Sequence, residues 1–407
     1  MNCLKKYHIP CLSLMPLFIV SVVFAEGDLG MENPRAADRC AELPQAMKIV
    51  QELRGLDFKH PVSCQALDQE SYTQRSIEYF YTLISQRELE LQEEVYQSIG
   101  LLPHDYPYAN CYLKESSRYT EAFYDIFHNE IVVPSWKKSE LHLLVHEAVH
   151  ALQDQHFDLA RHARRAVSTT DRSLAYSALV EGDAVEVQAL ALKKLDERRV
   201  PDESLHQLEP TECAFPASLE ALSYFPYEFG QVFADRLILS TKNFASINAA
   251  FRNPPQTTAE IMHSGYFGKF KPKSVDMPLM KLGRVFGFSS TPKQLFSDSI
   301  GQYAISLLLR ESMPKTTAIL AAKGWQGDKV ELYSLGESRL IIWSSLWGSL
   351  ADSEEFFRAL LLNLQERKGI TLRQESPQLL VSFPTTGEAL YLERSDSTVH
   401  MSIFLRG

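Results

Sequence analysis

A histidine pair with a glutamate beside its first member carries the clearest chemistry in this sequence. His146, Glu147 and His150 form the run HEAVH, inside a stretch over 139–157 that lacks Gly and Pro and has apolar residues at helical spacing. On a helix, residues four apart lie one above the other, so both imidazoles can face one point. A divalent metal could bind there, with Glu147 taking a proton from a metal-bound water. The alternative is a buried helix that carries these residues by coincidence.

A glutamate on a second expected helix supplies a candidate third ligand. The stretch 171–199 predicts a helix capped by Asp171, and Glu181 falls within its apolar row. A carboxylate in a buried row is costly unless it is paired or ligated. A catalytic zinc site usually has three protein ligands and an open position for water. We therefore expect one Zn²⁺ per chain, held by His146, His150 and Glu181. A core salt bridge to an arginine is the alternative role for Glu181.

Other polar or small residues near these helices are further candidates. Asp154, four residues after His150, could hold that ring through its second nitrogen, or could simply lie at a solvated helix end. Gly182 could allow the helix to approach the metal closely. His263 follows a short predicted helix capped at Thr257 or the next threonine. It could donate a hydrogen bond to an oxyanion, with a structural role as the alternative.

The first 25 residues have the pattern of a secretory signal peptide. Lys5 and Lys6 form a basic start, and 11–24 is an apolar core too short to span a bilayer. A short membrane anchor is the alternative. We expect the mature chain to start near Glu26, without a transmembrane segment, and to be secreted or to work in the periplasm or cell envelope.

Charge and cysteine content limit the classes of partner and compartment. The net charge is −10, and the signal segment holds two lysines and no acidic residue, so the mature chain carries −12. An acidic chain without basic runs argues against nucleic acid and anionic membranes as partners. Four of the six cysteines lie beyond the signal segment, which suggests two disulfides with three possible connectivities, or free buried thiols. We expect Cys40 to pair with Cys64, closing a short loop, and Cys111 with Cys213.

The remaining pattern predicts an α+β protein that is mostly helical. Residues 39–100 are expected to be largely helical, and 101–112, which contains two prolines, to be loop. Two short strands at 121–125 and 130–134 predict a hairpin. Its position before the motif helix would let it offer unpaired backbone to an extended peptide, although an ordinary sheet strand fits equally well.

The C-terminal part of the sequence is richer in strand-forming residues than the part before it. A helix is expected over 291–311, followed by five β-rich segments and an amphipathic helix at 353–366. We interpret these as an α+β element with an antiparallel sheet. The predicted domains are a signal peptide at 1–25, a catalytic domain with a helical N-terminal part at 26–290, and the C-terminal element at 291–407.

Several sequence blocks taken together resemble a secreted, largely uncharacterised family of gluzincin-like zinc metallopeptidases. The blocks run in the expected order over roughly residues 50–365. They are the strand pair at 122–125 and 130–133, HEAVHALQDQHFDL at 146–159, ALVEGDA at 178–184, FPYEFGQVF at 225–233, NPPQTTAEIMHSGY at 253–266 and AAKGWQGD at 321–328. Family members usually have an acidic residue where Ala259 stands and Lys where Gly265 stands. These departures put the role of the loop around His263 in doubt.

The resemblance implies a zincin-like core in which His146, His150 and Glu181 hold zinc and Glu147 is the general base. Zinc would lower the pKa of a bound water, and Glu147 would take its proton and later deliver it to the leaving amine. The expected function is hydrolysis of a peptide or protein substrate. The alternative is a catalytically silent, zinc-stabilised secreted protein that serves in binding or adhesion.

Overall fold

The computed structural model describes residues 20–21, 39–136, 140–195, 211–370, 377–383 and 387–407. The predicted signal peptide lies outside these residues except for two positions. The chain divides into two compact units. The first unit takes in Met1–Ile84, Asn110–Val167 and Ser173–Pro255, and the second takes in Ser85–Ala109, Ser168–Arg172 and Gln256–Gly407. This division differs from the predicted boundary at residues 290/291, because 85–109, 168–172 and 256–290 belong to the second unit.

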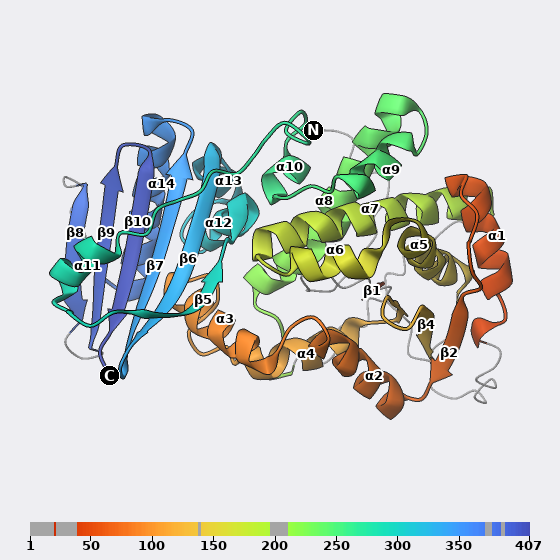
Figure 1. Cartoon of the computed structure of the whole chain (residues 1–407), viewed down its shortest axis with the longest axis horizontal. Coiled ribbons are helices and arrows are strands. Elements are labelled where there is room, and N and C mark those ends of the chain that lie inside the picture. The colour runs from red at the N-terminus through yellow and green to blue at the C-terminus, as the bar shows by residue number, and fades with distance from the viewer. Residues whose placement is uncertain (1–19, 22–38, 137–139, 196–210, 371–376, 384–386) are drawn as a thin grey trace. The chain divides into compact units, whose positions relative to one another are not determined.

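Helices make up most of the first unit (Figure 1). They are α1 (Leu43–Arg54), α2 (Gln69–Tyr81), α4 (Tyr108–Tyr119), α5 (Leu141–Phe157), α6 (Leu159–Ala166), α7 (Thr170–Lys194), α8 (Ala217–Thr241) and α9 (Ala245–Arg252). Helices α4 and α7 each begin with a few residues that the division assigns to the second unit. The loop expected over 101–112 is wrong in its last part. Pro107 directly precedes α4, and a proline at a helix start removes no internal hydrogen bond.

Helix α5 is the centre of the first unit. Every residue from His142 to Gln153 is buried, and the helix contacts α1, β3 (Ala122–Asp125) and β4 (Glu130–Pro134). The apolar residues of this helix therefore pack on several sides, which explains how polar residues on it come to lie in the interior. It ends at Asp158, which adopts a left-handed conformation with φ 56°.

A small sheet lies beside α5, with strand order β1-β3-β4-β2. Strands β3 and β4 pair antiparallel, so the predicted hairpin is confirmed. Residues 39–100 are largely helical, as predicted, with one exception: strand β2 (Ser63–Leu67), which pairs parallel with β4. This strand is held by its long-range partner, which the local pattern does not reveal. The other edge of β3 pairs antiparallel with β1 (Val20–Ser21), inside the predicted signal segment.

Two disulfides fasten the first unit, with the predicted connectivity. Cys40 is bonded to Cys64, which ties the residues before α1 to β2. Cys111 is bonded to Cys213, which ties α4 to the segment before α8 across 102 residues of sequence. The alternative of free thiols is therefore wrong. Cross-links of this kind fit an oxidising compartment. Within the described part of the chain, no helix has both the length and the apolar character needed to cross a membrane.

Helices α7 and α8 cross at two glycines. A Cβ atom on Gly182 would lie 2.2 Å from the carbonyl oxygen of Gly230, and one on Gly230 would lie 2.3 Å from that of Ala178. Only glycine permits this backbone approach. The missing side chain of Gly182 thus makes room for α8, and its role in the approach to a metal stays a prediction.

The second unit is built on a six-stranded sheet in the order β5-β6-β7-β10-β9-β8, with every pairing antiparallel (Figure 1). Its strands are β5 (Lys293–Asp298), β6 (Trp325–Leu335), β7 (Ser338–Trp347), β8 (Gln378–Phe383), β9 (Glu388–Ser395) and β10 (Thr398–Leu405). Its helices are α3 (Gln86–Ile99), α10 (Thr258–Met262), α11 (Leu279–Phe286), α12 (Gly301–Arg310), α13 (Lys315–Ala321) and α14 (Leu350–Lys368). The predicted C-terminal antiparallel α+β element is confirmed.

The sheet is covered on both faces. Leu282 of α11 packs with Leu340 and Ile342 on one face, and Phe356 of α14 packs against Trp343 and Trp347 on the other. Alternate residues of β7 therefore serve opposite cores. The helix predicted over 291–311 is wrong in its first half, which forms β5 along the edge of β6.

The predicted cap at Asp171 is also corrected. Asp171 lies inside the first turn of α7, and its carboxylate accepts hydrogen bonds from the amide of Thr258, at 2.8 Å, and from its hydroxyl. It therefore joins two segments of the second unit, where the local sequence indicates only a helix start.

Candidate metal centre

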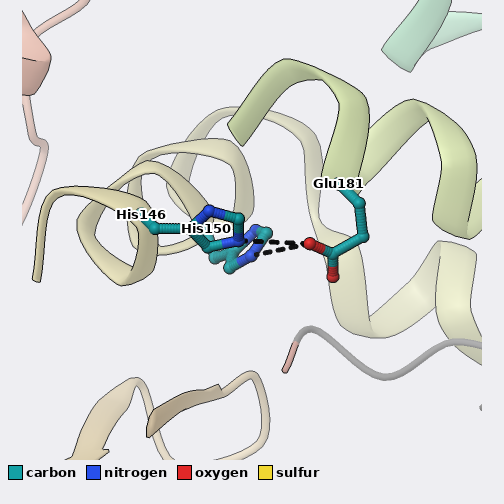
Figure 2. Close-up of side chains that lie close together, drawn as sticks. All are labelled: His146, His150 and Glu181. Carbon is teal, nitrogen blue, oxygen red and sulfur yellow. Dashed lines mark hydrogen bonds and ion pairs between the residues drawn. The ribbon is translucent and has the colours of Figure 1, made fainter. Parts of the chain in front are cut away.

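Helices α5 and α7 bring three of the predicted site residues together inside the first unit. His146 and His150 lie one turn apart on α5, and both direct a nitrogen toward Glu181 on α7 (Figure 2). The distance to Glu181 Oε2 is 3.1 Å from His146 Nε2 and 3.6 Å from His150 Nε2. All three side chains are buried, and their potential ligand atoms lie within 4.8 Å of one another.

The spacing of these atoms fits a tetrahedral ion. Two ligand atoms bound to zinc at about 2.1 Å with tetrahedral angles lie about 3.4 Å apart. The two nitrogen–oxygen distances of 3.1 and 3.6 Å fall on either side of that value. Among the described residues, neither His150 Nε2 nor Glu181 Oε1 has a hydrogen-bond partner. Buried polar atoms without partners are costly, and a metal ion bound at this point would give both atoms a partner.

The second nitrogen of each ring is held by a glutamine. His150 Nδ1 lies 3.0 Å from Gln153 Oε1, and His146 Nδ1 lies 3.3 Å from Gln188 Oε1. An amide oxygen only accepts, so each Nδ1 donates, and in the neutral ring each Nε2 then keeps its lone pair. Metal-bound histidines commonly have such a partner on the opposite nitrogen.

The predicted contact between Asp154 and the ring of His150 is wrong. The carboxylate of Asp154 accepts hydrogen bonds from the Tyr124 hydroxyl and the Leu159 amide, at 3.1 and 2.8 Å. These bonds hold Asp154 against β3 and the start of α6, and the ring of His150 is held by Gln153 instead. The alternative of a solvated helix end does not describe Asp154 either, because it is half-buried and both its carboxylate oxygens accept hydrogen bonds from the protein.

Electrostatics favour a charged Glu181. Burial acts to raise its pKa, but the facing rings of His150 and His146 outweigh burial and hold the pKa below the usual value. Glu147 precedes Ala148 on the same buried helix and is itself fully buried. The pair of imidazoles stands edge to face, with ring centroids 4.7 Å apart. A carboxylate that faces two imidazole nitrogens in the interior is an environment suited to a cation.

His263 belongs to the second unit. It directly follows α10, whose N-terminal cap is Thr257 as expected, and its Nε2 lies 3.0 Å from Gln302 Oε1. The ring of Tyr266 lies 4.9 Å away, centroid to centroid. The cluster of described residues that could hold a metal consists of His146, His150 and Glu181. A role for His263 at an oxyanion stays a sequence-based prediction.

Two residues of the site were missed from the sequence, Gln153 and Gln188. Gln188 follows Glu181 by seven residues, which is two helical turns, so it lies on the same face of α7. Gln153 follows His150 by three residues and lies on the face of α5 that carries the histidines. Helical spacing from each ligand is thus the signal that could have indicated both.

Comparison with known proteins gives information on one part of the chain. Residues 290–403 match the family model of a domain of unknown function, DUF8575. The matched segment contains the strands of the six-stranded sheet, the last of them up to Ile403, together with α12, α13 and α14, and it does not include His146, His150 or Glu181. No curated protein and no solved structure matches the chain.

Proposed function

We propose that the chain is a zinc-dependent metallopeptidase of the gluzincin-like type, with a zincin-like core formed by α5, α7 and the small sheet. His146, His150 and Glu181 would hold one Zn²⁺. The observation that carries the proposal is that two imidazole nitrogens, from histidines one helical turn apart, face one buried carboxylate. Three protein ligands leave a position open for water, as in catalytic zinc sites.

Zinc supplies Lewis acidity, which makes a water acidic at neutral pH and polarises a substrate carbonyl. The remaining chemistry belongs to this chain. Glu147, next to His146 on α5, would accept the proton of the attacking water and return it to the amine that leaves. Gln153 and Gln188 would keep both rings oriented through the reaction by accepting from Nδ1.

Strand β3 supports a peptide as the substrate. Its outer edge faces away from β4 and pairs with the backbone of Val20–Ser21, a segment that also contacts α5. An extended substrate could pair with β3 in the same way, which is a common mode of peptide recognition. Because Val20–Ser21 belongs to the predicted signal peptide, its removal would free this edge.

The test is the Glu147→Gln variant, assayed by digestion of a peptide library in the presence of Zn²⁺. Glutamine keeps the shape of the side chain but cannot accept the proton. Zinc content and folding should be unchanged, while turnover should fall by about two orders of magnitude or more, the usual contribution of a general base. Equal cleavage by wild type and variant would show that Glu147 is not the base.

A matched control is available in the same unit. Glu115 is a buried glutamate that pairs with Arg118 and lies outside the metal cluster. Glu115→Gln should therefore keep both zinc and turnover. If this variant lost activity as fully as Glu147→Gln, the effect would come from loss of a buried charge.

One observation favours the second candidate, a zinc-stabilised protein without catalysis. His146, Glu147, His150 and Glu181 are each at most 2% exposed, and closed surroundings are typical of structural zinc sites. The two functions predict the same zinc content. A zinc-loaded wild type that cleaves no peptide in the library would support the structural role and overturn the peptidase.

A further inference from the structure

A chain of buried side chains links the ring of His150 to an arginine on another helix. Gln153 Oε1 lies 3.0 Å from His150 Nδ1, and Gln153 Nε2 donates to Asp183 Oδ2 at 2.9 Å. Asp183 in turn forms an ion pair with Arg54, at 3.1 Å from Nε. The chain runs through α5, α7 and α1, all within the first unit.

The amide of Gln153 can have only one orientation in these surroundings. Its Nε2 also donates to the carbonyl oxygen of Val180, at 3.0 Å. The carbonyl of Val180 and the ion-paired carboxylate of Asp183 are both acceptors, so the amide nitrogen must face them. The amide oxygen must then face His150 and accept from Nδ1. In the neutral ring this arrangement leaves the lone pair on Nε2, the nitrogen that faces Glu181.

Arg54 is the charged end of this chain. Its side chain and that of Asp183 are fully buried. The guanidinium also donates to Asn248 Oδ1 at 2.8 Å and lies 4.5 Å from the ring centroid of Phe244. A buried carboxylate without its partner is strongly unfavourable, so Arg54 keeps Asp183 in place as the acceptor for Gln153.

His146 provides a comparison inside the same site. Its glutamine, Gln188, donates to a backbone carbonyl, that of His142, and both hydrogen bonds of this shorter chain are 3.3 Å long. Each hydrogen bond of the chain that starts at His150 is shorter than 3.3 Å, and that chain ends at a charged group, the guanidinium of Arg54. The two histidines are therefore held by the same device, with the stronger version on His150.

We propose that Arg54, Asp183 and Gln153 form a positioning chain that selects the Nδ1–H tautomer of His150, and that Arg54 thereby strengthens Zn²⁺ binding. The second clause rests on the proposed metal centre, whereas the first concerns the protein without metal. Arg54 would act through the two residues between it and the ring.

The tautomer can be measured in the metal-free protein by NMR of ¹⁵N-labelled histidine. In its neutral form, His150 of the wild type should carry its proton on Nδ1 and have an unprotonated Nε2. Arg54→Gln should lose this single tautomer, and Arg54→Lys, which keeps the positive charge beside Asp183, should retain it. Finding the Nε2–H tautomer in wild type overturns the proposal, even if no variant folds.

The affinity is measured by competition for Zn²⁺ with a chelator. Arg54→Gln should raise the Kd by about 10- to 100-fold, the range for groups behind a ligand, and Arg54→Lys should recover most of the loss. Asn248→Ala removes another partner of Arg54 while leaving the ion pair, so its Kd should match wild type. A loss as large in Asn248→Ala as in Arg54→Gln would show that packing is responsible and would overturn the proposal. A wild type that binds no Zn²⁺ would overturn the metal centre, while the tautomer measurement would still decide on the positioning chain.

Discussion

At the scale of single residues, the central feature of the candidate site is the carboxylate of Glu181, which faces two imidazole rings. Its carboxylate is buried, faces both Nε2 atoms and has a pKa held below the usual value by those rings despite its burial. A charged group in such a position either balances a cation or destabilises the fold. The same residue should therefore control metal affinity and stability together.

This gives a prediction for Glu181→Gln. The amide removes the negative charge, so the Kd for Zn²⁺ should rise by more than the 10- to 100-fold that is typical when a residue hydrogen-bonded to a metal ligand is mutated. Zinc at 100 times its Kd adds about 2.7 kcal/mol to the free energy of unfolding. Thermal melting with and without Zn²⁺ should thus show a stabilisation in wild type that is absent in Glu181→Gln.

Glu147→Gln is the comparison for that measurement. It should retain the zinc-dependent rise in melting temperature, because its carboxylate is proposed as a base and not as a ligand. If Glu181→Gln still gained as much stability from zinc as wild type does, Glu181 would not be a ligand.

Residue spacing predicted that the two histidines would meet because the helix geometry that brings them together is local. His146 and His150 are one turn apart, so their convergence follows from the helix alone. Glu181 could be predicted as a site residue because it stands in an apolar row of the sequence. The ion pair of Arg54 with Asp183 could not be predicted, since the two residues are 129 positions apart and neither belongs to a local pattern. Long-range partners of this kind need the fold.

At the scale of elements, the candidate metal centre depends on how closely α7 can approach its neighbours. Gly182 directly follows Glu181 and lies against Gly230 on α8, where a Cβ would be 2.2 Å from a carbonyl oxygen. Contacts shorter than 3.0 Å with backbone require the helices to separate. Any such movement carries the adjacent carboxylate with it.

We therefore predict that Gly182→Ala destabilises the protein and weakens zinc binding. Forcing an extra methyl group into a packed interior costs about 1–3 kcal/mol, even though alanine favours a helix more than glycine does. Urea unfolding and zinc titration measure the two effects. Gly230→Ala should have the same consequence, because its Cβ would meet the carbonyl oxygen of Ala178 at 2.3 Å.

Gly283 is a control for helix propensity. It lies in α11 of the second unit, where an added Cβ would be 3.3 Å from the nearest atom. Gly283→Ala should leave zinc affinity unchanged and stability nearly so. Unchanged zinc affinity in both Gly182→Ala and Gly230→Ala would show that Glu181 is not positioned by this crossing.

Element prediction succeeded where periodicity was strong and failed where pairing decided the outcome. The motif helix and the C-terminal strands have clear patterns, and the structure contains them. Residues 293–298 instead form β5, because β6 offers an edge with which they pair. Strand β2 likewise depends on β4, far along the chain. Strand formation is decided by such partners more than by intrinsic preference.

At the scale of the whole molecule, the two units have different origins of stability. The first is cross-linked by two disulfides and contains the candidate metal centre. The second has a sheet covered on both faces and a group of buried aspartates, Asp171, Asp298 and Asp328. These aspartates receive their hydrogen bonds from hydroxyls, indoles and backbone amides of the second unit. The absence of a cationic partner from those hydrogen bonds makes the second unit sensitive to pH.

Burial, and then the neighbouring carboxylates Asp328 and Asp298, raise the pKa of Asp171 to about 8 from its ordinary value of 3.8. Burial likewise raises the pKa of Asp298 to about 6. Between pH 4 and 8 the folded protein thus keeps a proton on Asp171 that the unfolded chain has lost. The contribution to stability is complete below pH 4 and disappears as the pH rises through 8.

From this we predict that the second unit loses stability between pH 6 and 8, and that Asp171→Asn reduces this loss. One proton held only by the folded state gives a slope of about 1.4 kcal/mol per pH unit. Asparagine resembles the protonated aspartate, since its oxygen can still accept from Thr258 while nothing titrates. Three of the four tryptophans, Trp325, Trp343 and Trp347, lie in the second unit, so urea unfolding followed by fluorescence reports mainly on it.

The exposed Asp105 of the same unit provides the control, and Asp105→Asn should keep the wild-type slope. If Asp171→Asn and wild type lost stability equally over this range, Asp171 would not be protonated in the folded protein, and its hydrogen bonds from Thr258 would have to stabilise a buried anion.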